Sequence, residues 1–248
     1  MNSKALDGKV VIMTGGSGLL GKEWKRALEE AGAKKVYVWD IKGDDSVDVT
    51  SEESVKAALA GVIAESHFVD VLINAAALNP VPGDPNCAKM FSSPEEYPID
   101  LWRKELEVGL TGAMICTKYV AKIMREQGGG SIINIGSHYG LVAPDNRIYS
   151  EGQFKSIGYA VSKGALPQFT RVWGTHLAPH NVRVNCLVLG GVQAGQSEEF
   201  VEKYKQRTPL RRMAKPGEYD DALVFLASEG SAFMTGQSLV MDGGWTAI

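Results

Sequence analysis

The chain has 248 residues, of which 44% are hydrophobic, and a length of this order commonly forms one domain around a single large core. Its formal net charge is −3 and it contains no long basic run, which argues against a nucleic-acid partner or an anionic membrane surface. The three cysteines suit neither a disulfide framework nor a metal site, no apolar run is long enough to cross a bilayer, and the polar start lacks the pattern of a signal peptide. We therefore expect a cytoplasmic protein with a small-molecule partner and no metal ion.

Short apolar, β-branched runs alternate with longer amphipathic segments, as is typical of βαβ units. We expect strands at 9–13, 35–40, 69–74, 131–135, 182–187 and 238–241, and a short stub at 46–49. The expected helices are 19–31, 52–65, 101–126, 159–178, 198–206 and 217–228. Together they predict an α/β fold of the Rossmann type: a doubly wound parallel sheet of about seven strands, with helices on both faces, in one domain spanning residues 1–248.

The first predicted strand runs into a glycine-rich turn that opens the first predicted helix. Glycines in this position let the backbone approach a pyrophosphate, which can bind the free N–H groups at the positive end of the helix. Such a turn can also be purely structural, so the motif alone is a weak signal. The residues that we expect to contact the cofactor here are Gly15, Gly16, Ser17, Gly18, Leu19, Leu20 and Gly21.

An acidic residue at the end of the second predicted strand strengthens this interpretation. Asp40 lies 19 residues after Gly21, where a carboxylate can accept hydrogen bonds from the ribose hydroxyls of a dinucleotide. The same carboxylate would repel a 2′-phosphate, so we expect NAD rather than NADP. The alternative is that Asp40 is an ordinary solvated turn residue.

Tyr159 and Lys163 are four residues apart on a predicted helix and therefore share one face of it. A free phenol has a pKa of about 10, and a nearby ammonium lowers this value towards the range in which a general acid or base works at neutral pH. Read alone, this spacing occurs by chance on many exposed helices.

Further motifs stand in order around this pair: Ser137 after a strand, Asn185 in the fifth long strand and the terminal run Met241-Asp242-Gly243-Gly244-Trp245. With them, essentially the whole chain resembles the classical short-chain dehydrogenase/reductase family. The resemblance implies a seven-stranded doubly wound sheet in a homodimer or homotetramer, and an alcohol/carbonyl redox site.

The resemblance also implies residue roles. Tyr159 would exchange a proton with the substrate oxygen, Ser137 would orient that oxygen, and Lys163 would hold the nicotinamide ribose, while the cofactor supplies the redox chemistry. Ser137 could instead be only a polar cap at the end of a strand. The remaining cofactor-binding positions implied by the resemblance are Asp48 and Val49 beside the adenine, Asn74, Ala75 and Ala76 after the third long strand, and the backbone of Val192 at the carboxamide.

The sequence departs from the family pattern at several places. Gly109 stands where the family usually has an asparagine that completes a proton relay, and a glycine inside a helix costs about 0.5 to 1 kcal/mol. The glycine turn has the spacing of the extended branch of the family, Leu189 replaces the usual proline, and Ala194 replaces the usual threonine. The connection from Asp40 to Asp48 is too short for the usual helix.

Two long loops, 78–98 and 144–157, are expected to leave the carboxyl edge of the sheet beside the substrate. The second is rich in side chains that bind hydroxyls or anions, among them Arg147 and Lys155. We therefore expect a polar, sugar-like substrate, and the region loosely resembles a subgroup linked to flagellin glycan and nonulosonic acid biosynthesis. Alternatively, both loops serve oligomer contacts or solubility.

Three functions remain open at this stage. The first is an active NAD-dependent dehydrogenase or reductase acting on a secondary alcohol or ketone. The second is a cofactor-binding sensor or partner subunit with weak or no catalysis, suggested by Gly109 and Leu189. The third is an epimerase or dehydratase of the extended branch, which the short C-terminal part of the chain disfavours.

Overall fold

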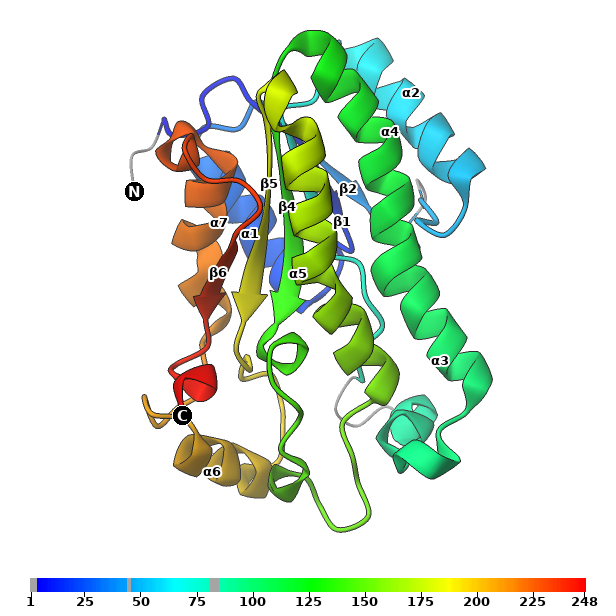
Figure 1. Ribbon diagram of the computed structural model, residues 1–248, viewed down its shortest axis with the longest axis vertical. Helices are drawn as coiled ribbons and strands as arrows, with labels where there is room; N and C mark the ends of the chain where they lie inside the picture. The colour runs from blue at the N-terminus through cyan, green and yellow to red at the C-terminus, as the bar shows by residue number, and fades with distance from the viewer. Residues whose placement is uncertain (1–3, 44–45, 81–84) are drawn as a thin grey trace.

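A computed structural model describes residues 4–43, 46–80 and 85–248 of the chain. Within these residues six parallel strands form a single sheet in the spatial order β2-β1-β3-β4-β5-β6 (Figure 1). The order reverses beside β1, which creates the crevice where ligands bind in folds of this kind. The strands are β1 (Val10–Thr14), β2 (Lys35–Trp39), β3 (Val71–Asn74), β4 (Gly130–Ser137), β5 (Val182–Leu189) and β6 (Ser238–Met241).

Helices cover both faces of the sheet (Figure 1). α1 and α7 contact each other on one face, while α2 packs beside α4 on the other, where α5 lies against β4 and β5. Nowhere in the described residues is a helix both long and apolar enough to cross a membrane. The helices are α1 (Leu19–Glu30), α2 (Glu52–Ser66), α3 (Ile99–Leu106), α4 (Gly112–Gln127), α5 (Ile157–Leu177), α6 (Glu198–Arg207) and α7 (Asp220–Ala227).

The alternation of side chains in β1 builds two cores at once. Val11 and Met13 point to the face where Trp24 of α1 is buried. Val10 and Ile12 point to the opposite face, beneath α2 and α4. A central strand covered on both faces is apolar throughout, as expected for a parallel sheet.

The prediction of a seventh strand is wrong, because the described residues form six strands. Residues 46–49 form no strand, and residues 44–45 lie outside the described ranges. The backbone N–H of Asp48 donates to Ser54 Oγ at 3.0 Å, and the Asp48 carboxylate accepts hydrogen bonds from the backbone N–H and hydroxyl of Thr50. The polar groups of Asp48 therefore form hydrogen bonds with residues at the start of α2 and not with a neighbouring strand.

The expected continuous helix over 101–126 is also interrupted. Between α3 and α4 the chain forms a π turn, Glu107–Thr111, with Gly109 at its centre. A Cβ at Gly109 would lie 3.1 Å from Ser162 Oγ, so the bare backbone allows α5 to pack closely against this turn. The interruption thus lies at the position where the family's usual asparagine is missing.

The strands end together at one edge of the sheet. The register pairs Thr14 with Asn74, and β4 and β5 run on until Ser137 lies opposite Leu189. In Figure 1 the arrowheads of β4, β5 and β6 point towards the end of the molecule that holds α6 and the loop between β4 and α5. Loops from distant parts of the sequence therefore converge at this carboxyl edge.

Candidate active site

The turn between β1 and α1 forms a backbone cradle. Gly15 has φ +68°, and a Cβ there would lie only 2.8 Å from the Cα of Ala76 in the neighbouring loop. Gly18 is the N-cap of α1 and offers no side chain to cap the helix, so its first N–H groups face outward. A bare helix start beside a turn without room for side chains fits the pyrophosphate of a dinucleotide.

Asp40 lies against this cradle, as the sequence predicts. Its Oδ2 accepts a hydrogen bond from the backbone N–H of Ser17 at 2.9 Å, and its Oδ1 accepts one from the N–H of Lys42 at 3.1 Å. The carboxylate is therefore held beside the glycine turn and is more than a solvated turn residue.

The end of β3 completes this side of the site. Thr14 Oγ1 accepts hydrogen bonds from the N–H groups of Ala75 and Ala76, which fastens β1 to the loop after β3. Asn74 is buried and donates to Thr117 and Asn134, but no partner among the described residues reaches its Oδ1. Such a buried acceptor is consistent with a ligand donor at this position.

Three other predicted cofactor positions lie around these groups. The Asp48 carboxylate is engaged by Thr50 at the start of α2, and Val49 is buried against the π-turn end at Gly112. Val192 forms a parallel bridge with Ala214 after β5. All three residues already have contacts within the protein, so binding a cofactor would be an additional role.

The predicted catalytic residues converge at the carboxyl edge. Ser137 is the last residue of β4 and is buried, and its Oγ accepts the N–H of Tyr139 at 3.2 Å, which is the capping role considered above. Tyr159 lies in the first turn of α5, and burial raises the pKa of its phenol while a hydrogen bond with the Ser137 side chain opposes that rise. The serine and the phenol are therefore within reach of a common substrate oxygen.

Lys163 lies one turn further along α5. Its amine donates to the carbonyl of Ile135 at 2.6 Å and is 5.8 Å from the ring centroid of Tyr159. Burial lowers the pKa of Lys163 to about 8. The expected lowering of the Tyr159 pKa is not seen in this arrangement, because burial of the phenol dominates and the Lys163 amine is directed to the β4 carbonyl.

A second lysine lies closer than Lys163 to the ring of Tyr159. The Nζ of Lys155 is 4.0 Å from the ring centroid of Tyr159 and donates to Asn79 Oδ1 at 2.7 Å. Burial lowers the pKa of Lys155 to about 7, the charge of Glu105 opposes this shift, and that of Lys163 adds to it. Lys155 was expected from the sequence to bind substrate hydroxyls or anions, but its closeness to Tyr159 was not predicted.

Beneath Lys155 lies a buried carboxylate that the sequence analysis missed. Glu105 of α3 is 1% exposed and accepts hydrogen bonds from Tyr97 Oη at 2.7 Å and Ser156 Oγ at 2.5 Å. Ser156 is the N-cap of α5 and in turn accepts the N–H of Tyr159 at 3.0 Å. Glu105 thus fixes the start of the helix that carries the candidate catalytic pair.

A sequence signal for Glu105 did exist. It is four residues after Leu101 and four before Gly109, which puts it on the same face of the predicted helix as these two apolar positions. An acid on such a stripe is rarely buried without partners, so it points to a polar cluster.

Arg147, the other cation of the 144–157 loop that we singled out, has a different role. Its guanidinium donates to both carboxylate oxygens of Asp145, and its side chain is 87% exposed. Arg147 therefore stays within its own loop, and the structure does not bring it to Tyr159.

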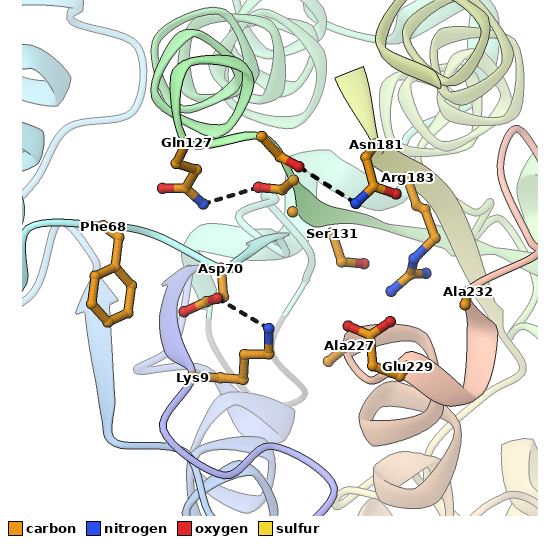
Figure 2. A pocket seen from close by; sticks show the side chains of 13 residues that line it. Lys9, Phe68, Asp70, Gln127, Ser131, Asn181, Arg183, Ala227, Glu229 and Ala232 are labelled. Carbon is orange, nitrogen blue, oxygen red and sulfur yellow. Dashed lines mark hydrogen bonds and ion pairs between the residues drawn. The ribbon is translucent and has the colours of Figure 1, made fainter. Parts of the chain in front are cut away.

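One cavity lies at the opposite end of the sheet (Figure 2). It has a volume of about 320 Å³ and is lined at the amino ends of the strands by residues such as Lys9, Asp70 and Arg183. Lys9 pairs with Asp70 at 3.2 Å, and Arg183 donates to the carbonyls of Leu226 and Ser228 at the end of α7. All three side chains therefore have protein partners, and they lie at the end of the sheet opposite the predicted catalytic residues.

Comparison with known proteins agrees with the fold. Residues 5–246 match the family described as Enoyl-(Acyl carrier protein) reductase. The cis-4-hydroxycyclohexanecarboxylate dehydrogenase of Sinomonas cyclohexanicum is 30% identical over 260 residues, with 97% of each chain covered.

Two solved structures share the architecture with a TM-score of 0.86. A short chain dehydrogenase from Leptospira borgpetersenii serovar Hardjo-bovis (strain JB197) with bound NAD⁺ is 30% identical and is matched over 97% of this chain and 94% of its own. A gluconate 5-dehydrogenase from Burkholderia cenocepacia J2315, in complex with NADP and tartrate, is 25% identical over 100% and 98% of the two chains.

Proposed function

The chain belongs to the short-chain dehydrogenase/reductase family, an NAD(P)-dependent group acting on CH–OH, and on that premise we propose that it oxidises or reduces a polar, hydroxylated metabolite with NAD. The observation that carries this proposal is the convergence of Ser137, Tyr159 and Lys163 at the carboxyl edge beside a cradle that holds Asp40. The reacting group is a secondary alcohol or its ketone.

The nicotinamide ring, when bound, takes up or supplies the hydride. Tyr159 Oη exchanges the proton with the substrate oxygen, and Ser137 Oγ donates a hydrogen bond that orients this oxygen. The Lys163 amine, bonded here to the Ile135 carbonyl, would bind the ribose hydroxyls of the cofactor. Because Gly109 has no side chain, water takes the place of the usual amide in the path of the proton.

Asp40 carries the proposed preference for NAD. Its carboxylate, held by the Ser17 N–H, is placed to accept hydrogen bonds from the adenosine ribose and to repel a 2′-phosphate. Among the solved relatives one is described with NAD⁺ and another with NADP, so the preference rests on Asp40.

The polar substrate is proposed from the loops at the carboxyl edge. The 144–157 loop brings the Lys155 ammonium over the Tyr159 ring, and the described part of the 78–98 loop supplies Asn79 beside it. The relatives named above act on hydroxylated compounds according to their names, which supports a substrate of this kind.

We also propose a homodimer or homotetramer in which α4 and α5 contribute to the interface. Met114 on α4 and Val161 and Val172 on α5 are exposed apolar side chains. Sedimentation of the purified chain tests this point, and a monomer at micromolar concentration would contradict it.

The experiment for the proposed reaction is a screen of polyols, sugars and hydroxy acids with NAD, followed by NADH fluorescence. Tyr159→Phe should bind NADH like the wild type and lose about 10²- to 10⁴-fold in turnover, the range for loss of a general acid/base. Tyr149→Phe is the matched control, because the Tyr149 hydroxyl bonds to that of Tyr139 and lies outside the proposed proton path.

The competing function is a cofactor-binding sensor without efficient catalysis, which the missing side chain at Gly109 favours. NADH binding without turnover of any compound in the screen would support the sensor. Turnover that survives Tyr159→Phe would instead overturn the proposed mechanism.

A further inference from the structure

We propose that Lys155 is a specificity-determining residue that binds a carboxylate of the substrate while Tyr159 acts on its hydroxyl. This inference rests on the proposed function and makes it narrower, because it identifies the substrate class as hydroxy acids. The family motifs around Tyr159 and Lys163 do not include this lysine.

The position of Lys155 favours contact with the substrate. The Lys155 ammonium lies over the face of the Tyr159 ring, 4.0 Å from its centroid, and is also 6.0 Å from the ring centroid of Tyr139. The residue is only half-buried, so one side of it remains accessible. A substrate whose hydroxyl reaches the Tyr159 oxygen must therefore pass close to this ammonium.

Lys155 has no bonded counter-charge among the described residues. Its hydrogen bond goes to the neutral amide oxygen of Asn79, and that of Lys163 goes to a backbone carbonyl. The charge of Glu105 acts on Lys155, but the two Glu105 oxygens accept the hydroxyls of Tyr97 and Ser156. A substrate carboxylate would give the Lys155 ammonium a directly bonded negative partner.

The charges around Lys155 agree with this arrangement. Burial and the charge of Lys163 on α5 lower the pKa of Lys155 to about 7, while Glu105 on α3 opposes the shift; the other groups facing it are the phenols of Tyr159 and Tyr139. A bound carboxylate favours the charged form of the lysine. Binding of a hydroxy acid above pH 7 should therefore take up protons from solution.

The position of Lys155 is fixed well enough for recognition. It directly precedes Ser156, which is the N-cap of α5 and is bonded to the buried Glu105. The backbone N–H of Lys155 also donates to Asn146 Oδ1 at 3.1 Å, within its own loop. The backbone of Lys155 is therefore anchored just before the start of α5.

The test compares hydroxy acids with neutral mates of the same shape, using the full-length chain with NAD. Suitable pairs are gluconate with glucitol, and 4-hydroxycyclohexanecarboxylate with its carboxamide. We expect kcat/KM to favour at least one acid over its mate by about tenfold or more, the usual range for one hydrogen bond to a charged group. Lys155→Met should abolish this advantage chiefly through KM, and Lys155→Arg should restore part of it.

Arg147→Met is the matched control, since it removes a cation from the same loop that is paired with Asp145 and exposed. It should leave the ratio of acid to neutral substrate unchanged. If Lys155 only tethers the loop to Asn79, Lys155→Met will lower turnover of acids and neutral mates equally, and the proposal is then wrong.

A second readout does not depend on turnover. Calorimetry of the protein–NADH complex should show that carboxylates of the panel bind with proton uptake at pH 8 in the wild type and not in Lys155→Met. The proposed role of Lys155 is wrong if both proteins bind the carboxylates equally, or if the wild type binds none of them. Turnover of neutral alcohols that requires Tyr159 would leave the proposed function intact in that case, whereas carboxylate binding without turnover of any alcohol would overturn only the proposed function.

Discussion

The two edges of the sheet hold their charged side chains differently. At the amino edge Lys9 pairs with the carboxylate of Asp70 (Figure 2), and the Arg183 guanidinium makes several hydrogen bonds, to the carbonyls of Leu226 and Ser228 and to the Ser231 hydroxyl. At the carboxyl edge the ammonium groups of Lys155 and Lys163 each make one hydrogen bond within the described residues, to the Asn79 amide oxygen and to the Ile135 carbonyl. A cavity of about 320 Å³ lies at the amino edge, whereas we propose that the substrate binds at the carboxyl edge, where the two ammonium groups have fewer hydrogen-bond partners.

The largest difference between the two edges is expected in how the free energy of unfolding responds to acid. His138 at the carboxyl edge is 3% exposed, and burial lowers its pKa to about 4 from 6.5. Between these two values the unfolded chain binds more protons than the folded one, so stability falls as the pH drops from about 6.5 to 4. The loss should be about 3 kcal/mol, measured by urea unfolding at several pH values.

His138→Gln should flatten this profile, since it removes the titrating imidazole. His180→Gln is the control at the amino edge, because His180 lies two residues before the start of β5. An unchanged acid profile in His138→Gln would show that the acid sensitivity has another source.

The second effect concerns the buried carboxylate under the catalytic helix. Glu105→Leu removes the acceptor of Tyr97 and Ser156 and should cost about 2 kcal/mol in the free energy of unfolding, the range for buried donors left without a partner. Turnover should fall as well, because Ser156 no longer holds the start of α5. Glu107→Leu, two residues away and exposed, should change neither quantity, and equal effects of the two variants would refute a special role for Glu105.

The third effect is a change of cofactor preference. Asp40→Ala should lower the ratio of kcat/KM for NAD over NADP by about tenfold, because the variant loses one charged acceptor and one source of repulsion. Steady-state kinetics with both cofactors measure this ratio. Glu23→Ala, which removes a carboxylate from the Arg26 ion pair on α1, should leave it unchanged. A ratio unaffected by Asp40→Ala would remove the basis for NAD.

The smallest effect is expected at the amino edge. Lys9→Met breaks a partly exposed ion pair, 34% and 19% exposed on its two sides, and such pairs contribute at most about 1 kcal/mol. Turnover should be unchanged. A large loss of activity in Lys9→Met would mean that the cavity in Figure 2 has a function that we have not assigned.

The sequence predicted best those features that depend on residues close together in the chain. The cradle at Gly15, the acid at Asp40 and the pair Tyr159 and Lys163 belong to local motifs, in which a few neighbouring residues determine the geometry. The parallel sheet followed from alternating apolar runs for the same reason. These features were predicted within a few residues of their observed bounds.

Features that depend on contacts between distant segments were not predicted. The stub at 46–49 looks like a strand by composition, but Ser54 of α2 takes its backbone N–H. The approach of Lys155 to Tyr159 requires Asn79, which is 76 residues away in the sequence. Likewise, Glu105 is separated from Ser156 by 51 residues, and no local pattern signals their hydrogen bond.

The buried Glu105 also constrains the evolution of the chain. A Cβ at Gly158 would overlap the Glu105 carboxylate, so the space of a missing side chain on α5 is filled by an acid from α3. Neither position can change alone without leaving a clash or a void beside Tyr159. Related sequences should therefore inherit the two residues together, glycine at 158 where 105 is acidic and larger residues where it is small, and this covariation can be read from an alignment.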